Sequence, residues 1–145
     1  MFDPSLEYGL LPSLTGFALR RASLLDFGGF GDALGDRSIT PLRYSLLEVV
    51  GANPGLQQVQ LADFLRLTKP AATLAIDFWE SRECISRRKD ARDRRSYGIY
   101  LTESGKRTLA KLQRRVVEHD QNLASCLTET ELRSLRGCLK KIYDN

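Results

Sequence analysis

Apolar residues recur at helical spacing from near the start of the chain and predict a first helix beginning at about Leu14. One stripe of this helix carries Leu14, Phe17, Ala18, Leu24 and Leu25. Arg21 falls on the same stripe, so a charged side chain interrupts an apolar surface. The adjacent Gly28 and Gly29 are expected to weaken or kink the helix near its end.

A second helix has a clear start, with Thr40 as its N-cap and Pro41 in the first helical position. It should run to about Gly51, where a cluster of helix-breaking residues (51–55) ends it. Its apolar positions, expected to be buried, are Leu42, Leu46, Val49 and Val50. A short third helix, at about residues 58–65, places Leu61, Ala62 and Leu65 on one side.

A fourth helix follows after a brief turn at residues 66–67, with Thr68 as its cap. One face of this helix is fully apolar and carries Ala72, Ala75, Ile76 and Trp79. The opposite face shows Lys69, Thr73 and Asp77, with Pro70 and Leu74 beside them. Two helices joined by so short a turn are typical of a helix-turn-helix.

The pattern then changes from helical to strand-like. Residues 85–89 and 96–101 predict two strands, joined by the charged loop 90–95. In the second strand Tyr97, Ile99 and Leu101 alternate with smaller or more polar residues. A two-stranded ribbon with arginines at its tip, directly after a helix-turn-helix, indicates a wing.

Two amphipathic helices complete the chain. The first opens at residues 102–105 and carries Leu109, Leu112, Val116, His119 and Leu123 on one stripe. Thr128 and Glu131 form a capping box for the second, with Leu127 as the apolar residue before the cap. The stripe of this last helix holds Leu132, Leu135, Leu139 and Ile142. Too little sequence remains to cover that stripe within one subunit, so we expect a homodimer.

Composition places the 145 residues, 42% hydrophobic and 28% charged, among ordinary globular proteins of one domain, residues 1–145. No apolar run approaches the roughly 18 residues needed to span a bilayer, and the N-terminus lacks a signal-peptide pattern, so we expect a cytoplasmic protein without a membrane partner. The scattered Cys84, Cys126 and Cys138 predict neither a disulfide framework nor a zinc site. We expect buried or idle thiols, with a redox role as the alternative.

The net charge of +4 is concentrated in one segment. Residues 82–96 contain seven bases and three acids, which accounts for the whole excess. Such a local basic patch favours phosphate as a partner, with a merely solvated basic loop as the alternative.

Enzyme chemistry finds little support in the sequence. The only histidine, His119, lies mid-helix on an apolar stripe without a nucleophile signature nearby, and is more typical of a satisfied core or interface residue. The glycine cluster at 28–31 neither follows a strand nor precedes a Lys-Ser/Thr pair. Metal-ligand spacings are absent as well. We therefore expect no catalytic residue, no metal site and no cofactor.

Three runs carry a family resemblance: LTKPAATLAIDFWE (67–80), RKDARDRR (88–95) and LTESG (101–105). In this order and spacing they resemble the signature of the MarR family: a hydroxyl-capped recognition helix, a D-x-x-D-R-R wing and an L-T-x-x-G helix start. The resemblance covers about residues 39–112. It implies a mainly α winged helix-turn-helix fold with a small β-hairpin wing. The DNA-binding lobe would span residues 40–101, and the helices of residues 1–39 and 102–145 would form the dimer.

The same resemblance implies roles for individual residues on double-stranded DNA. Lys69, Pro70 and Thr73 would face the major groove. In the wing, Asp93 would hold Arg94 in a salt bridge, Arg94 or Arg95 would enter the minor groove, and Arg92 would join the DNA contacts. Two residues depart from the family pattern. Leu74 stands where an arginine is frequent, which makes base recognition weaker or more apolar, for instance toward a thymine methyl group. Glu83 replaces the glycine that usually ends the recognition helix.

The family also implies a small aromatic or anionic effector that releases DNA. Arg21 on its apolar stripe must either pair with an acid or offer its guanidinium to an anionic ligand. Arg20, Arg21 and Phe17 are therefore the candidate effector residues, and the run GFALRRA (16–22) is similar to the branch that senses aromatic-acid CoA thioesters such as hydroxycinnamoyl-CoA. The redox-sensing branch carries its reactive cysteine in the first helix, whereas no cysteine precedes Cys84 here.

The sequence thus predicts a ligand-responsive transcription regulator, a repressor that binds a pseudo-palindromic operator as a homodimer. The alternative is a dimeric small-molecule-binding protein of the same fold without specific DNA binding. Such a protein would not need Arg94 and Arg95.

Overall fold

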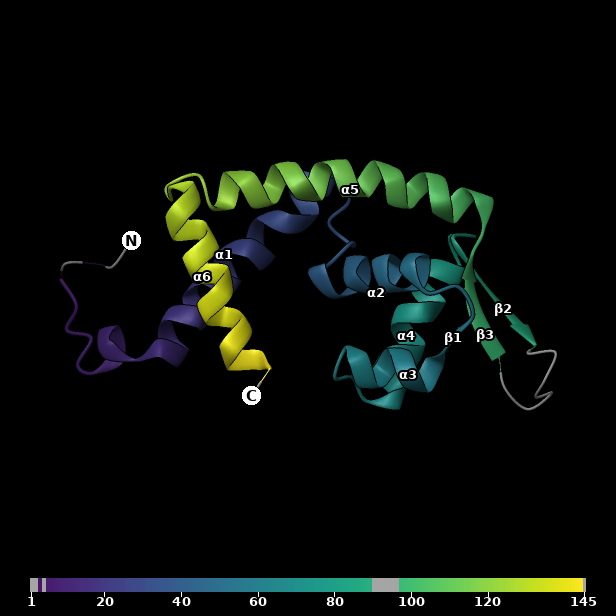
Figure 1. The fold of residues 1–145 in the computed structure, drawn as a ribbon, viewed down its shortest axis with the longest axis horizontal. Coiled ribbons are helices and arrows are strands. Elements are labelled where there is room, and N and C mark those ends of the chain that lie inside the picture. Colours follow the sequence, from purple (N-terminus) through teal and green to yellow (C-terminus); the bar gives the residue numbers. More distant parts are fainter. Residues whose placement is uncertain (1–2, 4, 90–96, 145) are drawn as a thin grey trace.

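A computed structural model describes residues 3, 5–89 and 97–144 of the chain. Within these ranges, the helices are α1 (Thr15–Leu34), α2 (Pro41–Ala52), α3 (Gln58–Phe64), α4 (Lys69–Glu80), α5 (Glu103–Leu123) and α6 (Glu129–Tyr143), after a short 3-10 helix, Leu11–Ser13. The strands are β1 (Leu56–Gln57), β2 (Ile85–Lys89) and β3 (Tyr97–Leu101). The predicted architecture, mainly α with a small β-ribbon, is confirmed (Figure 1).

Four threonine side chains cap helices where the sequence predicted helix starts. The hydroxyl oxygens accept hydrogen bonds from backbone N–H groups in the first turns of α2, α4, α5 and α6. The capping residues are Thr40, Thr68, Thr102 and Thr128. At α6 the capping box is complete, because Glu131 accepts from the Thr128 N–H at 2.8 Å. The hydrogen bonds between Glu131 and Thr128 hold the pKa of the Glu131 carboxyl below its ordinary value.

The first helix extends beyond the glycine pair at which the sequence predicts a weakened or kinked helix. It runs through Gly28 and Gly29 without interruption and ends only at Gly35, whose φ of 72° lies in the left-handed region. Beyond the glycine pair, Phe30 and Leu34 are buried in the core. Their packing outweighs the low helix propensity of the two glycines.

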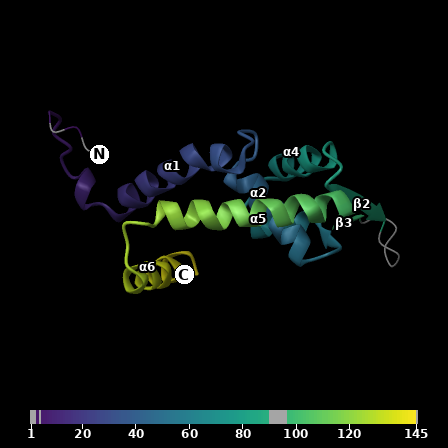
Figure 2. The same ribbon diagram turned by 90° about the horizontal axis from the view of Figure 1, so that it is seen from above.

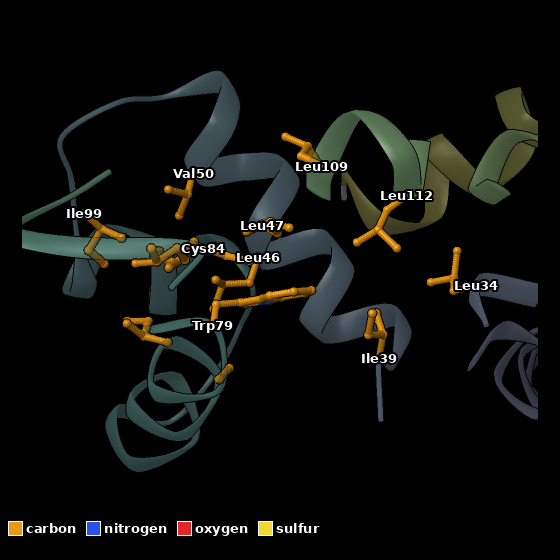
Figure 3. Packing of buried hydrophobic residues seen from close by; sticks show 14 of the residues in the cluster. Leu34, Ile39, Leu46, Leu47, Val50, Trp79, Cys84, Ile99, Leu109 and Leu112 are labelled. Atoms are coloured by element: carbon orange, nitrogen blue, oxygen red, sulfur yellow. The ribbon is translucent and has the colours of Figure 1, made fainter. Parts of the chain in front are cut away.

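The core lies where α2, α4, the sheet and the first half of α5 meet (Figure 3). Trp79 is at its centre and donates its indole N–H to the Arg43 carbonyl at 2.8 Å. One prediction was wrong here: Leu42 is 36% exposed, whereas Leu47 is fully buried. The reason is tertiary, since α2 packs against α4, β3 and α5 and is therefore covered on more than one side.

The three strands form an antiparallel sheet in the order β1-β3-β2, with Ile85 opposite Leu101 and Lys89 opposite Tyr97. This confirms the ribbon between β2 and β3. The sequence did not predict β1, which pairs Leu56 with Ile99. The predicted second strand began at Ser96, which lies outside the described residues.

The long helix α5 links the two ends of the molecule (Figures 1 and 2). Its first half covers α2 and the sheet, and its second half lies alongside α1. Leu109 and Leu112 are buried as predicted, but Leu123, on the same stripe, is 41% exposed. No described residue of α6 is buried within the single chain, so the stripe of that helix has no cover of its own.

Candidate nucleic-acid interface

The helix-turn-helix consists of α3, a tight turn and α4. Arg66 in the turn adopts a left-handed φ of 51°, and the Leu67 N–H donates to the Ala62 carbonyl at 2.8 Å. Ala62 and Ala72 are both buried, which is consistent with close packing of the two helices. The arrangement leaves one face of α4 pointing away from the core.

The outward face of α4 is more apolar than its sequence suggests. Lys69 and Pro70 are exposed, as predicted, and Leu74 is 70% exposed. Thr73 is only half-buried, and its hydroxyl makes two hydrogen bonds within the chain. It donates to the Lys69 carbonyl at 3.0 Å and accepts from Gln58 Nε2 at 2.7 Å. Sequence reasoning missed Gln58, because a polar residue at the first position of α3 carries no periodic signal.

Arg87 joins the ribbon to the recognition helix. From β2 it reaches across to α4, where its guanidinium pairs with Asp77 at 2.5 Å and also with Glu80. The side chain is only about a quarter exposed, at 27%. Arg87 therefore positions the base of the ribbon and is largely neutralised by two carboxylates.

Arg82 is likewise engaged within the chain. Its guanidinium pairs with Asp36 at 2.8 Å and donates to the Ser38 hydroxyl at 2.9 Å. It also lies 4.0 Å from the centre of the Phe78 ring, which Arg43 approaches to 3.9 Å. The Ser38 hydrogen bonds and the Arg82 charge hold the pKa of Asp36 below its ordinary value.

These pairings change the interpretation of the basic segment. Of its bases, Arg82 and Arg87 serve internal structure, whereas Arg88 and Lys89 are exposed at the end of β2. The remaining predicted wing contacts, Arg92, Asp93, Arg94 and Arg95, lie outside the described residues. The charge that the described part offers to DNA is thus smaller than the simple count of bases.

The segment after α4 contains Glu83, which replaces the glycine of the family pattern. Glu83 adopts a left-handed φ of 56°, the conformation that glycine accepts without strain. Its carbonyl accepts from the Thr102 hydroxyl at 2.5 Å, and the Thr102 N–H donates to the Cys84 carbonyl at 3.0 Å. A Cβ on Gly105 would lie 1.9 Å from that same carbonyl oxygen. The start of α5 therefore fixes the exit of the recognition helix, and glycine is required at position 105.

The candidate effector residues lie on α1. Phe17 and Arg21, one turn apart, are half-buried, with the Arg21 guanidinium 5.9 Å from the centre of the Phe17 ring. Arg20 is exposed. The structure thus brings Phe17 and Arg21 together and leaves Arg20 apart from them.

His119 is a satisfied interface residue, as predicted. Its Nε2 lies 2.9 Å from Asp26 Oδ1, its ring meets Phe30 edge-on at 5.5 Å, and its side chain is 13% exposed. The contact joins α5 to α1.

Cys84 is buried, whereas Cys126 and Cys138 are exposed. Within residues 3, 5–89 and 97–144, His, Cys, Asp and Glu side chains form no group suited to a metal ion. In the same ranges no helix has the length and apolar character needed to cross a membrane.

A helix-turn-helix followed by an antiparallel ribbon that is tied to its second helix defines the winged helix-turn-helix class of DNA-binding protein. The chain belongs to the MarR family of transcriptional regulators. The model of that family matches residues 39–97. A putative transcriptional regulatory protein for the hcr operon of Thauera aromatica is 30% identical over 139 residues, which cover 95% of this chain and 84% of the relative.

Solved structures agree with the assignment. The transcriptional repressor CouR bound to a 23-mer DNA duplex has a TM-score of 0.90 and 32% identity, covering 96% of this chain and 99% of that one. CouR bound to p-coumaroyl-CoA has a TM-score of 0.86 and 29% identity, covering 96% of this chain and 98% of that one. These relatives are named as transcription regulators, not as enzymes.

Proposed function

We propose that the protein is a ligand-responsive repressor that binds a pseudo-palindromic operator as a homodimer and is released by an aromatic or anionic effector. The observation that carries the proposal is the exposed outward face of α4 beside a ribbon that Arg87 ties to it. Lys69, near the helix N-terminus, is available for phosphate or a base edge. The likeness to CouR, which has been observed on a DNA duplex, supports DNA as the partner.

Exposed apolar side chains support the homodimer. Of 18 large hydrophobic residues exposed among the described residues, 13 lie in residues 6–27 and 117–143. A cleft of about 480 Å³ between α1, α5 and α6 is lined mainly by leucines, including Leu19, Leu123 and Leu135. Large apolar patches of this kind mark interaction surfaces. We assign residues 1–39 and 102–145 to dimerisation and residues 40–101 to DNA binding, within the single domain 1–145.

The wing contributes the remaining DNA contacts in this proposal. Arg92, Arg94 and Arg95 supply cations at the ribbon tip, and Asp93 orients Arg94 for the minor groove. Arg94→Ala and Arg95→Ala should each weaken operator binding, because a lost phosphate or groove contact is not replaced. Dimer mass and unfolding midpoint should stay unchanged, since a ribbon tip contributes nothing to the core. Two variants that bind as tightly as the parent would refute this role of the wing.

The effector site is proposed at Phe17 and Arg21, with Arg20 at its edge. An aromatic ring beside a guanidinium suits a ligand that is both aromatic and anionic. Aromatic acids and their CoA thioesters have this chemistry, and CouR has been observed with p-coumaroyl-CoA. A melting-temperature screen of such compounds tests the class, because a ligand at about 100 times its Kd adds roughly 2.7 kcal/mol.

Selection of duplexes from a random pool tests the function itself. We expect enrichment of a pseudo-palindrome whose half-sites lie about one helical turn apart. Enrichment of single half-sites would contradict binding as a symmetric dimer. A dimer that enriches no sequence would instead be the ligand-binding protein without specific DNA binding.

A further inference from the structure

We propose that the recognition helix selects thymine in each half-site through its 5-methyl group, which packs against Leu74 and the methyl group of Thr73. The inference rests on the proposed function, since it assumes that α4 enters the major groove of an operator. It deepens that function by naming a base and the residues that select it.

The Thr73 hydroxyl already makes hydrogen bonds within the chain. A hydroxyl has one proton to donate and two positions that accept. The Thr73 proton goes to the Lys69 carbonyl at 3.0 Å, and Gln58 Nε2 occupies one accepting position at 2.7 Å. No donor remains for the acceptor atoms that purines and thymine present in the major groove. One accepting position of the hydroxyl stays open for a base amino group, and the methyl group is the part of this side chain that can contact a thymine.

Leu74 places an exposed apolar side chain next to Thr73. Pro70, Thr73, Leu74 and Asp77 follow one another at helical spacing and share one face of α4. Leu74 is 70% exposed on that face, and exposure of a large apolar side chain beside a groove-facing residue is unfavourable until a partner covers it. In the major groove the prominent apolar group on a base edge is the thymine 5-methyl group.

Asp77, on the same face of α4, is already paired within the chain. A free carboxylate on this face could accept a hydrogen bond from cytosine N4. Here Asp77 pairs with Arg87 at 2.5 Å, which engages one of its oxygens and offsets its charge. The middle of the face therefore combines a methyl group and a leucine, with the polar Lys69 at its N-terminal end.

Replacement of thymine by 2′-deoxyuridine in a selected operator tests the proposal directly, because it removes only the methyl group. Burial of one methyl group corresponds to about fourfold in affinity, or ~0.8 kcal/mol. Symmetric replacement in both half-sites should therefore weaken the parent protein roughly fifteenfold, as measured by fluorescence anisotropy. The same replacement at flanking thymines outside the half-sites should have no effect.

Protein variants assign the effect to its residues through the ratio of the two affinities, thymine operator over deoxyuridine operator. Leu74→Ala should lower this ratio toward one, whereas Leu42→Ala, an exposed leucine on α2, should retain it. Thr73→Ser, which removes the methyl group, should lower the ratio. Thr73→Val, which removes the hydroxyl, should not lower the ratio, whatever the absolute affinity of this variant for the operator.

Two results would overturn the inference alone. One is an operator whose binding is indifferent to deoxyuridine at every half-site thymine. The other is an equal deoxyuridine penalty in Leu74→Ala and the parent. Failure to select any operator would refute the proposed function, and this inference with it.

Discussion

Glu83 holds a strained backbone conformation at the exit of the recognition helix, and its replacement by glycine should stabilise the protein. The φ of 56° costs an L-residue roughly 1–2 kcal/mol. Glycine gives back about 0.4–1 kcal/mol, because the unfolded chain gains conformational freedom. The difference leaves a stabilisation of ~0.5–1 kcal/mol for Glu83→Gly. For 145 residues, this corresponds to a rise in Tm of about 1–4 °C.

Urea unfolding at constant protein concentration measures the effect, because the stability of a dimer depends on concentration. Glu83→Ala is the matched control: it removes the same carboxylate but keeps a Cβ in the left-handed region. Ser81→Gly provides the opposite case, since Ser81 has a right-handed φ of −62° and glycine there should destabilise. If Glu83→Gly is no more stable than Glu83→Ala, the argument from backbone strain is wrong.

Three other predictions follow from contacts in the structure. Arg87→Ala should destabilise the protein by ~0.5–1 kcal/mol, after allowance for solvent screening, and should weaken operator binding, whereas Lys89→Ala should weaken binding alone. Equal unfolding midpoints of the two variants would contradict the positioning role of Arg87. Arg21→Ala should keep operator binding but abolish release by an aromatic anionic effector, with Arg20→Ala nearly silent; a normal response in Arg21→Ala would exclude the contact. Because the folded pKa of Asp36 is lowered, its carboxylate should stabilise the protein at pH values above the ordinary carboxyl pKa of 3.8, and this contribution should be lost as the pH falls through the folded pKa. Asp36→Asn should therefore make the dependence of stability on acid pH shallower, and an unchanged acid unfolding profile would count against this.

The sequence predicted best what local chemistry decides. The threonine caps of α2, α4 and α6, the helix start at residues 102–105 and the buried face of α4 were confirmed. A side-chain hydroxyl before a helix and a stripe at helical spacing both act within a few residues. The left-handed backbone at Glu83 agrees with the resemblance, which placed a glycine at this position.

Features that depend on tertiary packing were missed. The burial of Leu47 follows from the cover that several elements give α2, which the pattern of one helix cannot reveal. The two residues of β1 are too few to show a period of two. The pairing of Gln58 with Thr73 joins residues 15 positions apart, across two helices.

Arg87 illustrates the same limit for the candidate site. As a base in a basic segment it was counted toward phosphate binding. Only the placement of β2 beside α4 shows that Asp77 and Glu80 bind it. Charge counting therefore could not separate the structural Arg87 from the exposed Arg88 and Lys89 of the same segment.

Titration of a selected operator at several salt concentrations tests whether the chain is a dimeric DNA-binding regulator. One dimer should bind one pseudo-palindromic duplex, and the logarithm of the affinity should fall steeply and linearly with the logarithm of the salt concentration. Sedimentation of the same complex gives its stoichiometry. Binding of a single subunit, or an affinity that does not change with salt, would contradict the assignment as a dimeric DNA-binding regulator.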